Sequence, residues 1–170
     1  MEHRIYLALG TNLGDRFHHL QQAVSLLAPE VHVRRISPVY QTPPWGYLDQ
    51  PDFLNQALEA ATDLAPEALL RYLKAIEKEM GREKVVRNGP RIIDLDILFY
   101  DDLILKTEDL QIPHWGVAQR AFVLEPLADL APELRHPQTG RTVEEMLAGV
   151  DRSGVTLFWR PDRDHPEHME

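Results

Sequence analysis

Hydrophobic and polar positions in the first thirty residues follow a strand-like period and then a helix-like period. The stretch RIYLALG, residues 4–10, predicts a short strand that ends at Gly10. Asp15 can cap a helix that continues to Pro29, and its apolar residues recur at helical spacing. Those apolar residues are Phe17, Leu20, Val24 and Leu27. Gly10 and Gly14 then read as a tight turn between the strand and the helix.

The next segments alternate between extended and irregular structure. Residues 31–42 look extended, and Pro38 indicates a sheet edge or a break. Residues 42–52 form a loop by composition, because three prolines and one glycine fall within eleven residues. Residues 53–61 fit either a strand or a helix. We favour a strand, because a clear helix follows directly.

That helix begins at Pro66, a favourable first helical residue, and stops at Gly81. Its apolar stripe consists of Leu69, Leu73, Ile76 and Met80. A charged loop at 82–90 then leads into a hydrophobic strand. The remaining expected elements are, in chain order, a hairpin through Asp101 and Asp102 to the stretch LIL, a long connection, and short helices near 126–131 and 142–148.

Strands that alternate with helices predict an α/β (α+β) sandwich, with helices packed on a mostly antiparallel sheet. The 170 residues suit one domain with a sizeable core, which we place at residues 1–160. Residues 161–170 read as a disordered tail. The chain shows no internal repeat, low-complexity segment or interdomain linker.

Two aspartates interrupt the most strand-like stretch of the chain, RNGPRIIDLDILFY at residues 87–100. Successive side chains of a strand point to opposite faces, so one apolar face goes to the core. That face consists of Ile93, Leu95, Ile97 and Phe99. Asp94 and Asp96 share the other face, with their backbones roughly 6.5 Å apart. An unpaired buried carboxylate is costly, so we expect something to compensate their charges.

Two carboxylates on one face can converge on one or two cations, and paired metal ions in phosphoryl-transfer sites lie ~3.5 to 4 Å apart. Mg²⁺ fits best, because this hard ion is held by one or two carboxylates together with phosphates and waters. Arg82, Arg87 and Arg91 lie near the aspartates in sequence, and arginine suits phosphate. The pattern indicates a metal–polyphosphate site, and a solvated face with Asp–Arg pairs is the simpler alternative.

Composition and the absence of known motifs exclude several classes of function. The formal net charge of -9 argues against a broad nucleic-acid-binding surface. The absence of cysteine excludes disulfides and thiolate chemistry, and it fits a cytoplasmic location. No apolar run approaches the ~18 residues that span a bilayer, and the N-terminus lacks the features of a signal peptide. The sequence contains no P-loop, dinucleotide fingerprint, nucleophile elbow or kinase catalytic-loop motif.

Four blocks occur in order over nearly all of residues 4–148: LALGTNLGDR, YQTPPWGYLDQPDFLN, RNGPRIIDLDIL and IPHWGVAQRAFVLEPLADLAPEL. In these blocks the chain closely resembles the 6-hydroxymethyl-7,8-dihydropterin pyrophosphokinase family, whose members transfer a diphosphate from ATP to a pterin alcohol in folate biosynthesis. The block GPR-x-x-DLDIL is the most specific signature. The resemblance implies a ferredoxin-like sandwich and two Mg²⁺ ions that Asp94 and Asp96 hold against the ATP phosphates.

The resemblance implies roles for other positions as well. The pterin-binding residues would be Thr42, Pro43, Pro44, Trp45, Phe53, Asn55 and Phe122. Phe53 and Phe122 would sandwich the pterin ring, and Asn55 would pair with its donor and acceptor edge. As isolated residues, both phenylalanines would fit a plain core equally well. The ATP-binding residues would be Lys74, Glu77, Arg82, Arg91, Ile97, His114, Trp115 and Arg120. Arg82 and Arg91 would also act in catalysis with the two aspartates.

In the implied reaction the pterin hydroxymethyl oxygen attacks the β-phosphorus of ATP and AMP leaves, while the loops 43–51 and 82–90 close over the substrates. The expected partners are these small molecules, without nucleic acid or membrane, and we expect a monomer in the cytoplasm. Two other classes stay open: an Mg²⁺-dependent phosphohydrolase that needs no pterin, and a ferredoxin-like binding module without turnover. The paired pterin and ATP motifs favour the pyrophosphokinase.

Overall fold

The computed structural model describes residues 1–44, 50–81 and 92–161 of the chain. Within these ranges its strands and helices are, in chain order, β1 (His3–Thr11), α1 (Arg16–Leu26), β2 (Val31–Ile36), β3 (Val39–Thr42), β4 (Phe53–Thr62), α2 (Pro66–Glu79), β5 (Asp94–Tyr100), β6 (Leu105–Lys106), β7 (Gln111–Ile112), α3 (Ala121–Leu130), α4 (Val143–Ala148) and β8 (Thr156–Trp159). In the described part of the chain, each helix is too short or too polar to span a lipid bilayer.

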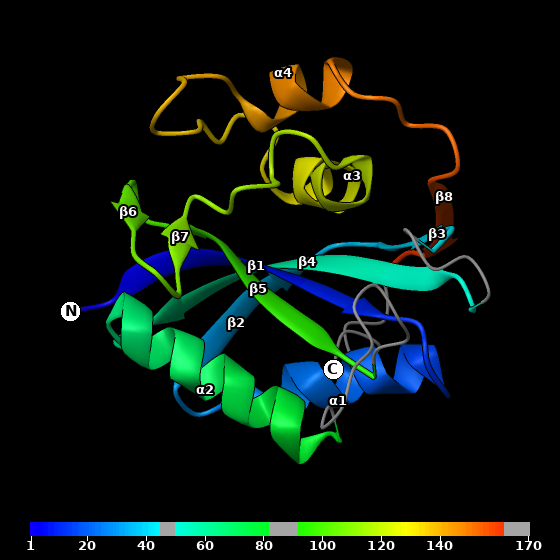
Figure 1. Ribbon diagram of the computed structural model, residues 1–170, viewed down its shortest axis with the longest axis horizontal. Helices are drawn as coiled ribbons and strands as arrows, with labels where there is room; N and C mark the ends of the chain where they lie inside the picture. The colour runs from blue at the N-terminus through cyan, green and yellow to red at the C-terminus, as the bar shows by residue number, and fades with distance from the viewer. Residues whose placement is uncertain (45–49, 82–91, 162–170) are drawn as a thin grey trace.

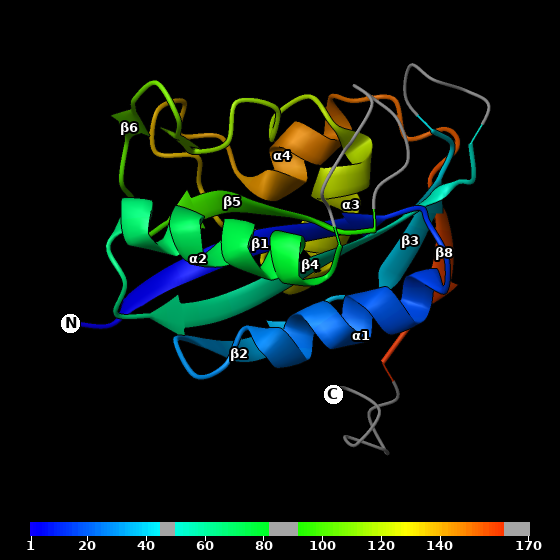
Figure 2. The ribbon, with the colours of Figure 1, turned by 60° about the horizontal axis from the view of Figure 1, so that its bottom comes forward.

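The main sheet is antiparallel and runs in the order β5-β1-β4-β3-β8, with β2 also paired to β4. The strand order β5, β1, β4 and β2–β3, with α1 after β1 and α2 after β4, is that of a ferredoxin-like unit. Helices α1 and α2 cover one face of the sheet, and α3 and α4 cover the other (Figure 1, Figure 2). The predicted antiparallel sandwich is confirmed, and it carries helices on both faces.

Each helical layer packs on the sheet through its own apolar cluster. The cluster next to α1 and α2 includes Leu20, Leu69, Leu73, Leu95 and Ile97. The cluster next to α3 and α4 includes Tyr6, Leu98, Phe99, Leu124 and Leu127. Burial of this apolar area drives folding at about 25 cal/mol per Å². Strands β1, β4 and β5 are therefore mostly buried on both faces, and a polar group on either face of them needs a local reason.

Several local signals act as the sequence predicts. Asp15 caps α1 by accepting the His18 backbone N–H at 3.3 Å. Pro66 is the first residue of α2, and Gly81 follows its C-cap with φ at 102°, a conformation that favours glycine. Residues 53–62 form a strand, as favoured over a helix. Thr142 caps α4 in a capping box with Glu145, which fixes the expected helix near 142–148.

The strand β5 departs from the predicted alternation after Ile97. Its pairing with β1 shifts register between Leu7, which faces Ile97, and Tyr6, which faces Phe99, so Leu98 is an extra residue. The bulge moves Phe99 to the α3 side of the sheet, whereas Ile97 stays on the α2 side. The prediction that Phe99 shares the face of Leu95 and Ile97 is wrong for this reason.

Other expected elements also differ. The hairpin through Asp101 and Asp102 does not form with LIL as its second strand, because β6 pairs with β7 in a separate two-stranded sheet. Helix α3 begins at Ala121 and not near 126, with Pro126 inside it. Strand β8, which extends the sheet beyond β3, was not expected. Gly10 is a paired residue within β1, so Gly14, with φ at 71°, provides the turn without it.

Candidate active site

A pocket opens on the face of the sheet that carries α3. Its floor comes from β1, β4 and the start of β5, and its walls come from the first turn of α3, the loop before α3 and the end of β3. The residues that line it are Ala8, Leu9, Gly10, Thr42, Pro43, Phe53, Asn55, Gln56, Asp94, Asp96, Leu98, His114, Arg120, Phe122 and Val123. Five separate parts of the sequence therefore meet in one pocket.

Small residues of β1 create the floor between two functional strands. Gly10 is paired with Asp94 of β5 on one side and with Asn55 of β4 on the other. Ala8 is paired with Asp96 on the β5 side, one step of the pleat away. A Cβ atom added at Gly10 would lie 3.4 Å from Oδ1 of Asn55. The absence of a side chain at Gly10 keeps open the space between the aspartates and the amide.

The two aspartates share the pocket face, as the strand period predicts. Leu95 points to the opposite face and is buried against α2, whereas Asp94 and Asp96 are half-buried and line the pocket. Two carboxylates suit Mg²⁺, which completes its six ligands with waters and phosphate oxygens. Among the described residues no cluster of three or more His, Cys, Asp or Glu side chains could hold a metal ion. The donor set thus fits a metal that arrives with a phosphate ligand.

On the far side of Gly10, the pocket is aromatic and amide-lined. Phe53 of β4 is paired with Thr42 of β3, and Phe122 enters from the first turn of α3. The buried side chain of Asn55 donates from Nδ2 to Oγ1 of Thr42 at 2.9 Å. This bond holds the amide in one orientation, with Oδ1 on the Gly10 side. A flat ring with hydrogen-bonding edges matches these walls.

A histidine and an arginine supply the polar donors opposite the aspartates. Nδ1 of His114 accepts the backbone N–H of Gly116 at 3.0 Å, so the neutral ring carries its proton on Nε2. Burial, with a smaller effect from the charge of Arg120, lowers the pKa of His114 from its usual 6.5 to about 4. At neutral pH His114 is therefore an uncharged donor, which can bind a phosphate oxygen.

The guanidinium of Arg120 lies between two aromatic rings. Its Cζ atom is 4.4 Å from the ring centre of Trp115 and 5.6 Å from that of Phe122. Burial lowers the pKa of Arg120, and the charge of Asp96 acts in the opposite direction. A Cβ atom at Gly116 would approach Nε of Arg120 to 2.8 Å, so this loop position favours glycine. The stacking holds a fixed positive charge near the aspartates.

Comparison with known proteins assigns the chain to a family. Residues 6–132 match the model of the 7,8-dihydro-6-hydroxymethylpterin-pyrophosphokinase (HPPK) family. The chain belongs to this family. It is 44% identical over 157 residues to the 2-amino-4-hydroxy-6-hydroxymethyldihydropteridine pyrophosphokinase of Pseudomonas aeruginosa, with 91% of this chain and 96% of that protein covered.

Longer proteins match the chain as well. The Folic acid synthesis protein fol1 of Schizosaccharomyces pombe is 44% identical over 155 residues, which are 90% of this chain. The chain spans 21% of the length of that protein. The crystal structure of Plasmodium falciparum HPPK-DHPS wild type with STZ-DHP superposes with a TM-score of 0.70 at 19% identity, covering 87% of this chain and 43% of that one. This structural likeness shows the shared fold.

The pocket contains most of the site residues expected from sequence. Among the described residues, those predicted from sequence that line it are Thr42, Pro43, Phe53, Asn55, Asp94, Asp96, His114, Arg120 and Phe122. Trp115 is exposed beside the pocket and contacts Arg120 and, by ring stacking, His114. Pro44 is half-buried and is not part of the lining. Trp45, Arg82 and Arg91, together with Arg87, lie outside the described residues.

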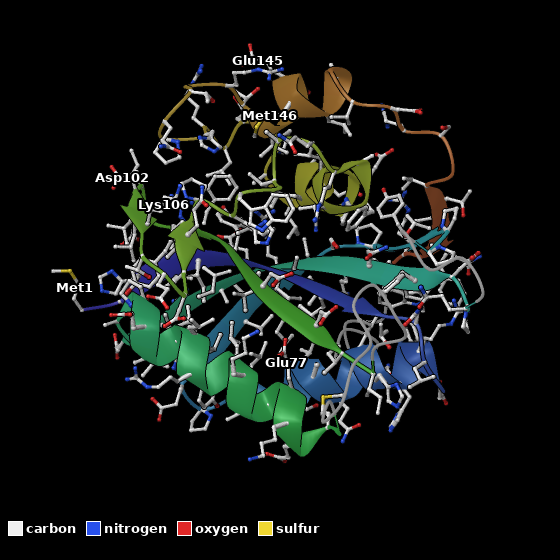
Figure 3. The ribbon with its side chains drawn as sticks, viewed as in Figure 1. Met1, Glu77, Asp102, Lys106, Glu145 and Met146 are labelled. Carbon is white, nitrogen blue, oxygen red and sulfur yellow. The ribbon has the colours of Figure 1, made fainter. Side chains whose placement is uncertain are left out.

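Three of the expected ATP-binding side chains lie elsewhere. The Ile97 side chain is buried in the core on the α2 side of the sheet. Glu77 is buried between α2 and β5 (Figure 3), where it accepts the backbone N–H of Leu95. Lys74 is an exposed residue one turn away on α2, with Nζ 3.6 Å from Oε1 of Glu77. None of these three side chains lines the pocket as it is described.

The sequence reasoning missed the residues that form the pocket floor and part of its wall. Ala8 and Gly10 alternate along β1 on one face, and two small residues at that spacing could have signalled an open floor. Val123 lines the pocket because α3 begins at Ala121, and this early start has no clear sequence signal. Leu98 lies on the face of Asp94 and Asp96, where the strand period alone places it.

Proposed function

We propose that the protein uses this pocket to transfer a diphosphate from ATP to the hydroxymethyl group of 6-hydroxymethyl-7,8-dihydropterin, which gives AMP and the pterin diphosphate in folate biosynthesis. One observation carries the proposal: a carboxylate pair and an aromatic, amide-lined wall face each other across the small residues of β1. A phosphohydrolase would need the carboxylate pair but not the aromatic, amide-lined wall. The family membership of the chain supports the same reaction.

The pterin ring would lie between Phe53 and Phe122, with its polar edge against Asn55. The amide of Asn55 offers an acceptor toward the pocket, while its nitrogen donates one hydrogen bond to Thr42. An amide held in this way can reject rings that lack the matching donor, because a buried polar group left unpaired costs about 1–3 kcal/mol. Specificity for the pterin would thus reside in Asn55 and Thr42.

The triphosphate of ATP would lie over Asp94 and Asp96 and under His114 and Arg120. The two aspartates would hold the Mg²⁺ ions, which neutralise phosphate charge and orient the phosphates when they are bound. His114 donates from Nε2 without carrying charge, and Arg120 adds a fixed positive charge. Arg82 and Arg91 match positions with the same role in the family, and they lie outside the described residues.

In the proposed step, the hydroxymethyl oxygen attacks the β-phosphorus in line. A bond forms between that oxygen and the β-phosphorus, and the bond from the β-phosphorus to the oxygen that bridges the α- and β-phosphates breaks. AMP leaves with the bridging oxygen and the electron pair, and the alcohol proton passes to a base, for which either aspartate qualifies. The pocket contributes position and charge, as in other phosphoryl transfers.

Separation of the nucleotides after incubation with ATP, Mg²⁺ and the pterin tests the reaction. We expect AMP to appear only when the pterin is present, in equal amount to the pterin consumed. ADP would indicate an ordinary kinase, and inorganic phosphate without pterin would indicate the hydrolase. Nucleotide binding without any turnover would leave the binding module as the better description.

The partners, location and oligomeric state of the protein are separate expectations. The two substrates are small molecules, and the cytoplasmic location, the monomeric state and the absence of nucleic-acid or membrane partners stay predictions from the sequence. The net charge of -9 argues against a nucleic-acid partner, and the lack of cysteine fits a cytoplasmic location.

A further inference from the structure

Glu77 is a buried carboxylate that the pocket does not use directly. It lies on α2 with 2% of its surface exposed, and it reaches the sheet between α2 and β5 (Figure 3). Oε2 of Glu77 accepts the backbone N–H of Leu95 at 2.7 Å. Burial of a carboxylate is costly unless its hydrogen bonds repay it, so this position needs a reason beyond helix formation.

The N–H group that Glu77 binds belongs to the residue between the two aspartates. Strand β5 lies at one end of the sheet order, and backbone groups on the outer edge of such a strand lack a neighbouring strand. Leu95 also packs its side chain against α2, so the residue is held by both its backbone and its side chain. With Leu95 fixed, the pleat directs Asp94 and Asp96 to the pocket on the other face.

We infer that Glu77 is a positioning residue, which fixes the direction of the Asp94–Asp96 pair toward the metal–phosphate complex through its hydrogen bond to Leu95. The inference rests on the proposed function, in which the two aspartates hold Mg²⁺. It differs from the role implied by the family resemblance, in which Glu77 contacts ATP itself. A group that orients metal ligands from behind typically changes metal affinity or activity by about 10- to 100-fold when it is removed.

Two substitutions separate the acceptor atom of Glu77 from its charge. Glu77→Gln keeps an oxygen at the same reach and loses the charge, whereas Glu77→Asp keeps the charge and is one methylene too short to reach Leu95. We expect Glu77→Asp to raise the Mg²⁺ concentration for half-maximal binding of α,β-methylene-ATP about tenfold or more, with a fall in kcat. We expect Glu77→Gln to stay within about threefold of the unsubstituted protein in both measures.

A matched control removes another hydrogen bond made by the same helix. The Tyr72 hydroxyl on α2 donates to the backbone carbonyl of Leu27 at 2.9 Å, on the side of α2 that meets α1. Tyr72→Phe should lower the unfolding temperature without changing the Mg²⁺ requirement. Pterin affinity, measured by fluorescence without nucleotide, should stay within about twofold in all three variants, because the pterin wall does not involve Leu95.

Amide hydrogen exchange provides a readout that does not depend on turnover. The Leu95 amide should exchange slowly in the unsubstituted protein and in Glu77→Gln, and faster by about tenfold or more in Glu77→Asp. The inference is overturned if Glu77→Asp leaves both Leu95 exchange and the Mg²⁺ requirement unchanged. It is also overturned if Glu77→Gln is as impaired as Glu77→Asp, since charge would then matter and not the acceptor.

A third result would indicate that Glu77 contacts the nucleotide directly. If Glu77→Asp weakened nucleotide binding equally at all Mg²⁺ concentrations, the positioning role would be refuted. The proposed reaction fails separately: a protein that shows the expected Leu95 exchange and Mg²⁺ dependence but makes no AMP from ATP and pterin would refute the reaction and leave the positioning role in place.

Discussion

At the scale of single residues, the direction of Asp94 and Asp96 follows from the leucine between them. Leu95 is buried on the α2 side, so the alternation of the strand turns both carboxylates into the pocket. This part of the site could be predicted from the sequence. Once the core face of the strand is known, alternation places both aspartates of DLD on the opposite face. The partner of Leu95 could not, because nothing in the sequence pairs Glu77 with a backbone amide 18 residues away.

Asp96 should be needed for turnover and not for folding. Asp96→Ala removes one of two expected metal ligands from the pocket surface and leaves both apolar clusters intact. We expect kcat to fall by about 10²–10³-fold or more, the range for the loss of one strong electrostatic contact. The unfolding temperature should shift by no more than about 4 °C, which corresponds to about 1 kcal/mol at this size. A variant that keeps most of its rate would exclude the metal-ligand role.

His114 should titrate far below an ordinary histidine. Its lowered pKa of about 4 results first from burial and then from Arg120. Nuclear magnetic resonance of the ring protons without nucleotide should give a midpoint near that value, and addition of α,β-methylene-ATP should raise it, because the phosphate charge favours the imidazolium form. A midpoint near 6.5 without ligand would show that the ring is solvated and not held as a neutral donor.

At the scale of elements, β1 separates the phosphate half of the pocket from the pterin half. Its small residues leave room between Asp94 on β5 and Asn55 on β4. Neighbouring strands lie ≈ 4.8 Å apart, so two strand steps place the halves roughly 10 Å from each other. That separation suits a flat ring on one side and a phosphate chain on the other.

Gly10→Val should fill the space that the small residues of β1 leave between Asp94 and Asn55. The valine side chain would project toward Asn55 and Phe53, which lie 3.4 Å and 3.9 Å from an added Cβ. We expect the dissociation constant for the pterin to rise at least about tenfold, or about 1.4 kcal/mol. Gly10→Ala should have a smaller effect, because its single methyl group meets Asn55 at ordinary contact distance. Equal pterin affinity in Gly10→Val and the unsubstituted protein would contradict the proposed position of the ring.

The elements that escaped prediction share a physical cause. The helix expected near 126–131 begins earlier, because contacts of the preceding apolar residues with the sheet extend α3 back to Ala121. The bulge at Leu98 depends on its pairing with β1 and has no local signal. Strand β8 is four residues long and gains its structure from β3. Tertiary contacts decided each of these cases.

At the scale of the whole molecule, the pocket lies where the ferredoxin-like unit meets its second helical layer. The unit supplies the floor through β1, β4 and β5, and α3 with the loop before it supplies one wall. The family resemblance implied the ferredoxin-like unit, and the periodicity predicted helices packed on a mostly antiparallel sheet. The layer formed by α3 and α4 was predicted only as short helices, because their position above the sheet depends on packing with Phe99 and Leu98.

Stability should decrease as the solution becomes moderately acidic. Burial lowers the pKa of both His114 and His136 in the folded protein, so between pH 6.5 and about 4 the unfolded chain binds more protons. The free energy of unfolding should therefore be constant with respect to these groups above pH 6.5 and fall as the pH drops toward 4. Urea denaturation at pH 7.5 and pH 5 checks this sign.

His114→Asn provides the matched comparison, because the asparagine oxygen can replace Nδ1 as acceptor for the Gly116 N–H. This variant should lose less stability between pH 7.5 and pH 5 than the unsubstituted protein. An equal or larger loss in His114→Asn would show that His114 does not contribute to the acid sensitivity.

The central claim is that the pocket presents the pterin alcohol to the β-phosphorus of ATP. The most direct test uses a pterin whose hydroxymethyl oxygen is ¹⁸O, with ATP and Mg²⁺, followed by phosphorus NMR. We expect AMP without label and a pterin diphosphate whose inner phosphorus shows the ¹⁸O isotope shift. Label on a pterin monophosphate formed with ADP, or phosphate released while the labelled alcohol stays intact, would contradict it.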